Sequence, residues 1–150
     1  EDGRIIGVTE ELSAQDIYEL GQDLEPFVIA GGTRMGHAHL SVKNSREASS
    51  FYQESLGLED KFTIPHASWI ASGDYHHHLA VNEWGGKNLA RREHGMVGLS
   101  YYVVEVENKE ELLKVFAQSQ TDKAITQWIS SAEFRITDND GIMTRIRVRN

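Results

Sequence analysis

The sequence predicts an α+β fold made of two βαβββ units that follow one another along the chain. Residues 35–86 and residues 95–149 each contain an alternating strand, an Asn-x-x-Glu helix start and three short strand candidates, in the same order. Self-similarity on this scale indicates an internal repeat. We therefore expect one domain over residues 35–150, preceded by a lead-in over residues 1–34.

The lead-in is expected to contain a short strand, a short helix and a linker. Residues 5–8 (Ile-Ile-Gly-Val) have the composition of a strand. Ser13 is placed to cap a helix with Asp16 three residues later, and that helix should end near Gly21. A proline and a Gly-Gly pair then indicate a linker over residues 25–32.

The first unit opens with a strand over residues 37–42, where apolar side chains alternate with two histidines and a serine. Asn44 and Glu47 form a capping-box pair for the helix that follows, and Gly57 is placed to end it. Three strand candidates come next, at residues 61–64, 67–71 and 76–82.

The second unit has the same plan. A strand over residues 99–106 precedes a helix that begins at Asn108 and Glu111. Its three strand candidates are residues 125–128, 133–136 and 143–148.

Superposing the two units pairs histidines of the first with other residue types in the second. When Asn44 is placed on Asn108, Tyr101 falls opposite His37. When the closing strands are aligned, Arg145 falls opposite His78. A site that needs histidine at all four positions is therefore not expected.

Composition and charge exclude several classes of protein. With 150 residues and 39% hydrophobic side chains, the chain can form one domain with a core. The net charge of -8 argues against nucleic acid or an anionic membrane as a partner. The absence of cysteine excludes thiolate chemistry and suits a cytoplasmic location. Because the chain begins with Glu1 rather than Met, we expect a fragment or a processed product.

Five of the seven histidines lie in two short runs, one opening the first strand and one opening the closing strand of the first unit. If Leu79 faces the helices, strand alternation puts His76 and His78 on the opposite face. His77 then shares the side of Leu79. The histidines expected on one concave face are His37, His39, His76 and His78.

Two interpretations of this face remain open. Imidazoles with a carboxylate form the usual site for Zn or Fe(II), with positions left open for water and substrate. Glu83 and Glu105 are the candidate carboxylates. Alternatively, the histidines lie on the solvent face of the sheet and bind nothing.

Other chemistry has less support. The sequence has no glycine-rich phosphate loop and no G-x-S-x-G motif. Trp84 beside a Gly-Gly pair is a candidate for stacking on a substrate, although a core or rim role is more common. The row Arg145, Arg147 and Arg149 is more typical of an exposed edge strand than of an anion site.

Three motifs carry a family resemblance. They are Gly-His-Ala-His-Leu at residues 36–40, Phe-Tyr…Leu-Gly-Leu over residues 51–58, and Tyr-His-His-His-Leu at residues 75–79 with Asn82 and Trp84 after it. Together they resemble the vicinal oxygen chelate superfamily of glyoxalases, bleomycin-resistance proteins and extradiol dioxygenases. The triple-histidine motif is similar to the C-terminal half of bacterial catechol 2,3-dioxygenase-like proteins.

The resemblance implies a cup-shaped, partly open mixed sheet, with the helices on its outer face, around Fe(II) or Mn(II). It places His37 and His78 at ligand positions of the first and closing strands. The next two ligand positions of the family fall on Tyr101 and Arg145, which are not expected to coordinate. Further ligands would then come from a missing N-terminal half, and pairing with that half or a homodimer is expected.

The activity implied is extradiol ring cleavage of a catechol-type aromatic by dioxygen, with this chain forming part of the active site. His39 or His76 would act as a base or hydrogen-bond donor, and Tyr101 would bond to the substrate. Two alternatives remain. One is a non-catalytic module that binds or sequesters a small ligand, as in bleomycin-resistance proteins. The other is a glyoxalase-type lyase, which needs carboxylates where Tyr101 and Arg145 stand.

Overall fold

The computed structural model describes residues 11–21, 29–86, 88–93, 95–121 and 124–149, and the chain divides into residues 1–36 and 37–150. The first part contains α1 (Ala14–Gly21). Its predicted N-cap is confirmed, because the Ser13 hydroxyl accepts from the N–H of Asp16 at 3.3 Å. The strand predicted at residues 5–8 lies outside the described residues. In the described part of the chain, no helix has the length and apolar character needed to cross a membrane.

The first repeat forms a four-stranded mixed sheet with one helix. Strand β1 (Ala38–Ser41) leads into α2 (Ser45–Leu56), and the later strands are β2 (Glu59–Ile64), β3 (Ala67–Ala71) and β4 (Leu79–Asn82). Strand β1 lies parallel to β4, and the strand order is β1-β4-β3-β2. The predicted cap of α2 is confirmed: Asn44 Oδ1 accepts from the N–H groups of Arg46 and Glu47 at 3.1 Å each.

The second repeat has the same topology, which confirms the predicted pair of βαβββ units. Its elements are β5 (Tyr102–Val106), α3 (Lys109–Gln118), β6 (Ile125–Ser130), β7 (Glu133–Thr137) and β8 (Met143–Val148). The strand order is β5-β8-β7-β6. Strand β8 therefore lies inside the sheet, and the edge-strand interpretation of Arg145 and Arg147 is wrong. The side chain of Arg147 pairs with Glu105 of β5 at 2.7 Å.

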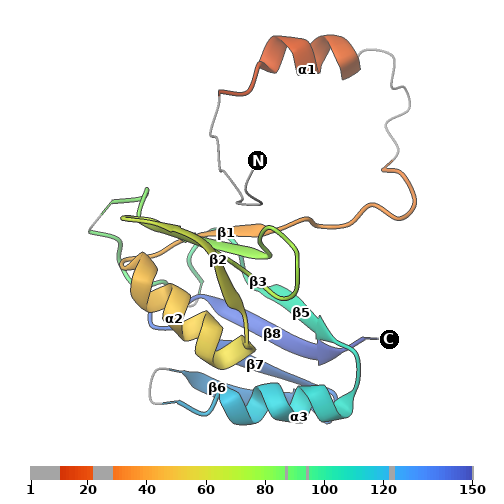
Figure 1. The fold of residues 1–150 in the computed structure, drawn as a ribbon, viewed down its shortest axis with the longest axis vertical. Helices are drawn as coiled ribbons and strands as arrows, with labels where there is room; N and C mark the ends of the chain where they lie inside the picture. Colours follow the sequence, from red (N-terminus) through yellow and green to blue (C-terminus); the bar gives the residue numbers. More distant parts are fainter. Residues whose placement is uncertain (1–10, 22–28, 87, 94, 122–123, 150) are drawn as a thin grey trace. The chain divides into compact units, whose positions relative to one another are not determined.

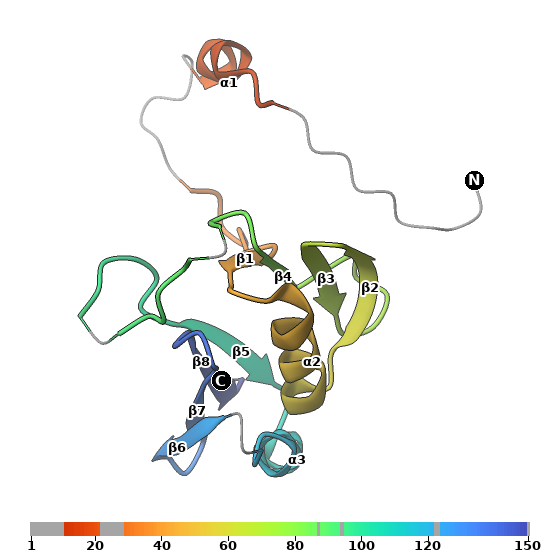
Figure 2. The same cartoon turned by 90° about the vertical axis from the view of Figure 1, so that its left-hand side faces the viewer.

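One hydrophobic core joins the two repeats. Helix α2 packs on the first sheet, α3 packs on the second, and the two helices contact each other (Figures 1 and 2). Buried residues from both repeats form a single cluster, among them Phe51, Tyr52, Ile70, Leu112, Phe134 and Ile146. Because the helices take one face of each sheet, the opposite faces are left for side chains that bind ligands.

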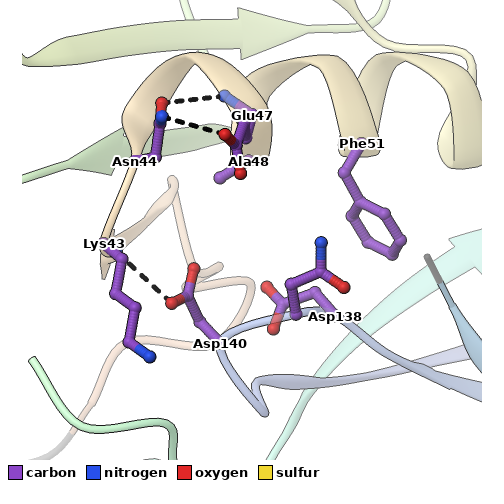
Figure 3. A pocket seen from close by; sticks show the side chains of 8 residues that line it. Lys43, Asn44, Glu47, Ala48, Phe51, Asp138 and Asp140 are labelled. Atoms are coloured by element: carbon purple, nitrogen blue, oxygen red, sulfur yellow. Dashed lines mark hydrogen bonds between the residues drawn. The ribbon is translucent and has the colours of Figure 1, made fainter.

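Polar contacts at the turn between β7 and β8 also connect the repeats. The buried hydroxyl of Tyr52 on α2 donates to Asp138 Oδ2 at 2.7 Å. The backbone N–H of Lys43 donates to Asp140 Oδ1 at 3.3 Å (Figure 3). A cavity of about 200 Å³ lies between this turn and the start of α2. Burial raises the pKa of the Asp138 carboxyl and raises the pKa of Tyr52 well above its ordinary value.

Candidate metal centre

Three histidine side chains meet beside the first sheet. His37 and His39 flank the first residue of β1, and His77 lies two residues before β4. Their ligand-capable ring nitrogens all lie within 4.8 Å of one another. The ring centroid of His37 is 4.2 Å from that of His77 and 5.1 Å from that of His39. Nitrogen ligands of one tetrahedral ion lie roughly 3.3 Å apart, so small side-chain rotations would complete a shared site.

Strand pairing brings these residues together from distant parts of the sequence. Strand β1 pairs in parallel with β4, with Ala38 opposite Leu79. The N–H of Ala38 donates to the carbonyl oxygen of His78 at 3.0 Å, and the N–H of His78 donates to the carbonyl oxygen of Ile70 at 2.9 Å. These bonds fix the backbone of His78, the residue directly after His77. The imidazole cluster, defined as His37, His39 and His77, thus lies beside the pair of β1 and β4, where β1 is the edge strand of the sheet.

The triple-histidine segment differs from its prediction, because it is not part of the strand. Residues 76–82 were expected to alternate as one strand, but β4 begins at Leu79 and its four residues are all buried. Alternation therefore does not determine the directions of the three histidines. His77, expected on the side of Leu79, lies with His37, and the ring of His76 packs at 4.4 Å from that of His77.

His78 has different surroundings from the imidazole cluster. Its Nδ1 accepts from the backbone N–H of Ser72 at 3.2 Å, and its ring lies 4.8 Å from that of Tyr75. Burial, with a smaller effect from His76, lowers the pKa of His78. One of its two nitrogens is therefore committed to the turn before β4.

The electrostatic setting favours the neutral imidazoles of His77 and His39. Burial and the neighbouring imidazoles lower the pKa of His77 to about 4, and burial followed by the nearby His37 lowers that of His39. A neutral imidazole has a free lone pair, which a metal ion requires. The Nε2 of His77 is buried and has no hydrogen-bond partner among the described residues. A buried polar atom without a partner costs roughly 1–3 kcal/mol, and a bound cation would remove that cost.

The two candidate carboxylates are engaged elsewhere. Glu83 Oε1 accepts from the backbone N–H and the hydroxyl of Ser45, each at 2.9 Å, and Oε2 lies 3.1 Å from His66 Nδ1. The two bonds from Ser45 lower the pKa of Glu83. Glu105 pairs with Arg147. Among the described residues, the group suited to a metal consists of three imidazoles and no carboxylate.

Tyr101 and Arg145, opposite the histidines in the repeat, form a pair of their own. The guanidinium of Arg145 lies over the ring of Tyr101 at 4.6 Å, and its Nε donates to Glu133 Oε1 at 2.5 Å. Trp84 is 59% exposed, with its ring 6.2 Å from that of His39. The exposed ring of Trp84 thus provides an aromatic surface beside the imidazole cluster.

Comparison with known proteins places this arrangement in a family. The family model described as the Glyoxalase/Bleomycin resistance protein/Dioxygenase superfamily matches residues 34–146. The chain belongs to this superfamily. It is 30% identical over 113 residues to the catechol-2,3-dioxygenase of Bacillus subtilis (strain 168), in a match that covers 74% of this chain and 40% of that protein. The chain thus spans about two fifths of that relative's length.

Solved structures of this superfamily share the fold. The lactoylglutathione lyase of Agrobacterium tumefaciens is 13% identical, with a TM-score of 0.57 over 79% of this chain and 96% of that one. The fosfomycin resistance protein FosX of Listeria monocytogenes is 12% identical, with a TM-score of 0.58 over 79% and 94%. These likenesses support the α+β fold. They carry no information on substrate, because the sequence identities are low.

In this superfamily member, the residue that sequence reasoning misplaced is His77. One signal was available: Ser72-Gly73-Asp74 is a turn, and Gly73 has a φ of 63°. After a turn, several residues pass before the backbone joins a strand. Alternation counted back from Leu79 therefore did not give the directions of the three histidines. The donor set still fits a divalent metal, because imidazole is a common ligand of Fe and Zn.

Proposed function

We propose that this chain holds Fe(II) or Mn(II) at His37, His39 and His77 and forms part of an extradiol-type dioxygenase for catechol-type aromatics. The observation that supports the proposal is the convergence of ring nitrogens from three histidines within 4.8 Å. Among the described residues, the buried Nε2 of His77 also has no hydrogen-bond partner. The identity to a catechol-2,3-dioxygenase supports the reaction class. When bound, such an ion would act as a Lewis acid that orients the adjacent oxygens of a catechol.

The remaining side chains have positioning roles in this proposal. Trp84 offers an apolar face on which an aromatic ring can stack beside His39. His76, whose ring is 5.8 Å from that of His37, is the base proposed to accept a substrate proton through one water. Tyr101 hydrogen-bonds to the substrate from the second repeat. Because the chain spans 40% of its relative, we propose that the full site also needs a second copy or an N-terminal half.

Metal titration tests the ligand assignment. Purified chain is titrated anaerobically with Fe(II), and with Mn(II) followed by electron paramagnetic resonance. We expect one ion per chain, with His37→Ala and His77→Ala each weakening binding at least tenfold. His78→Ala is the matched control, because its Nδ1 is bonded to Ser72, and it should retain the ion. Loss of the ion in the His78 variant together with retention in the His77 variant would overturn the assignment.

Ring cleavage tests the activity. The iron-loaded chain, alone and with a separately expressed N-terminal half of a related dioxygenase, is given catechol and oxygen. Both oxygen atoms should appear in one ring-opened product, measured by oxygen uptake and mass spectrometry. Stoichiometric metal without oxygen uptake in either mixture would leave the small-ligand binding module as the function. Turnover of a hemithioacetal without oxygen would instead indicate a glyoxalase-type lyase.

A further inference from the structure

Strand β6 is a free edge of the second sheet. The strand order β5-β8-β7-β6 places it at the outer end, where Figure 2 also shows it. Its ladder with β7 is regular from Ile125 to Trp128 and uses one side of its backbone. Among the described residues, no backbone hydrogen bond reaches the other side. The N–H and C=O groups along that side are therefore available to pair with a further strand.

The equivalent edge of the first sheet is protected, whereas β6 is not. Strand β2 is the outer strand of its sheet and contains Glu59, Asp60 and Lys61. Charged side chains on an edge strand oppose pairing with another chain, because the pairing would bury them. Strand β6 has the same length of six residues, yet its sequence Ile-Thr-Gln-Trp-Ile-Ser contains no charge and no proline. The two repeats thus differ in whether their outer edge can accept a strand.

Apolar side chains are exposed on both faces of β6. Ile125 and Ile129 are 65% and 45% exposed, and they line the open cavity on the concave face of the sheet. Trp128 is 38% exposed and lies on the opposite face, where its ring is 4.5 Å from that of Phe116 on α3. A small ligand in the cavity would cover the two isoleucines and leave Trp128 exposed. An added strand would cover both faces, because its own side chains alternate between them.

A second copy of β6 is the partner that fits this edge. Two identical strands that pair antiparallel are related by a two-fold axis, which is the commonest symmetry of protein dimers. With the axis at Gln127, Ile125 of one copy lies opposite Ile129 of the other. Thr126 then lies opposite Trp128, and pairs of β-branched and aromatic side chains stabilise a sheet. Because the strand is uncharged, its pairing brings no like charges face to face, although the chain has a net charge of -8.

We propose that the chain forms a two-fold dimer in which the β6 strands of two copies pair antiparallel and join their four-stranded sheets into one. The contact involves one strand from each copy, so we expect a weak dimer, with a dissociation constant in the micromolar range. The imidazole cluster lies beside the first sheet and takes no part in this contact. The dimer should therefore form equally with and without a bound metal.

A single introduced cysteine tests both the contact and its register. The chain has no cysteine, so Gln127→Cys carries one thiol. At the two-fold axis this residue lies opposite its own counterpart, and mild oxidation should link most chains into disulfide dimers, measured by electrophoresis without reductant. Asp60→Cys, at an exposed position on the outer edge of the first sheet, is the matched control and should remain largely monomeric. Equal cross-linking of the two variants would contradict the proposal.

Sedimentation velocity measures the dimer without a covalent link. In a buffer with a metal chelator, the parent chain should change from monomer to dimer as its concentration is raised through the micromolar range. Ile125→Lys adds a charge to the edge and should weaken association about tenfold. Ile64→Lys, at an exposed position of β2, is the control and should associate as the parent does. Circular dichroism checks that both variants fold. A parent chain that stays monomeric, or a folded Ile125→Lys protein that associates normally, would overturn the proposal.

Discussion

His77 and His78 are neighbours in the chain, yet their ring nitrogens have different partners. The buried Nε2 of His77 has no partner among the described residues, whereas Nδ1 of His78 accepts from Ser72. The path of the backbone over residues 75–78 thus determines which of these imidazoles is free to bind a metal. Residue type alone predicted that histidines would gather beside this sheet. It did not predict which member of the triple would join the others.

Glu83 offers a test of a residue whose role is structural. Glu83→Ala should lower the melting temperature by several degrees at pH 7, because it removes the acceptor for two bonds from Ser45 at the start of α2. Glu54→Ala, an exposed change on the same helix, is the control and should have little effect. Scanning calorimetry measures both. A Glu83→Ala protein as stable as the Glu54→Ala protein would contradict this role.

The same residue predicts a pH dependence. The folded-state pKa of Glu83 is lowered, so its stabilising effect is present above the ordinary value of 4.5 and is lost as the pH falls through the folded value. The advantage of the parent over Glu83→Gln should therefore shrink below pH 4.5. An advantage that stays constant between pH 7 and pH 3.5 would show that the charge is not involved.

At the scale of elements, local sequence signals predicted where helices begin but did not predict which strands lie inside a sheet. Helix starts at Asn44 and Asn108 depend on bonds within four residues, and both were predicted correctly. The position of β8 inside its sheet depends on pairing with β5, just over forty positions earlier in the sequence, so the arginine row was misread as an edge. Glu83 and Glu105 were likewise candidate metal ligands because they are carboxylates. Both instead bond to residues that are distant in the sequence.

The turn between β7 and β8 contains a glycine, Gly141, that lies close to another loop. Gly141 has a φ of 81°, and a Cβ there would collide with the carbonyl oxygen of Arg92. Gly86 has a φ of 91° with open space around it. Gly86→Ala should cost about 1 kcal/mol of unfolding free energy from backbone strain alone. Gly141→Ala should cost about 2 kcal/mol more, because the loop must also move. Urea denaturation compares the two, and equal costs would contradict the close approach.

The whole molecule depends on contacts between its repeats. Each repeat has its own sheet, but a single core and the Tyr52–Asp138 bond cross from one to the other. Composition and periodicity predicted two similar units. They could not predict the buried Asp138, because the turn Asp-Asn-Asp-Gly looks like an exposed polar loop. Its burial follows from α2 packing against the second repeat.

Asp138 predicts how the stability of the whole domain varies with pH. Burial raises its folded-state pKa above 3.8, so its favourable effect is full below that value and is lost as the pH rises through the folded value. Asp138→Asn keeps an acceptor for the N–H of Ile142 and has no carboxyl to ionise. The stability of this variant relative to the parent should therefore rise between pH 4 and pH 7.5, measured by urea denaturation. A constant difference would contradict the effect of burial.

The parallel pairing of β1 with β4 also links metal supply to folding. His37 directly precedes the first strand of the repeat and His77 precedes its last, so the two lie some forty residues apart in the unfolded chain. An ion bound by both would be a reversible cross-link that exists only in the folded chain. At a free concentration a thousand times its dissociation constant, it would add about 4 kcal/mol to the free energy of unfolding. The amount of folded protein would then follow the availability of the metal.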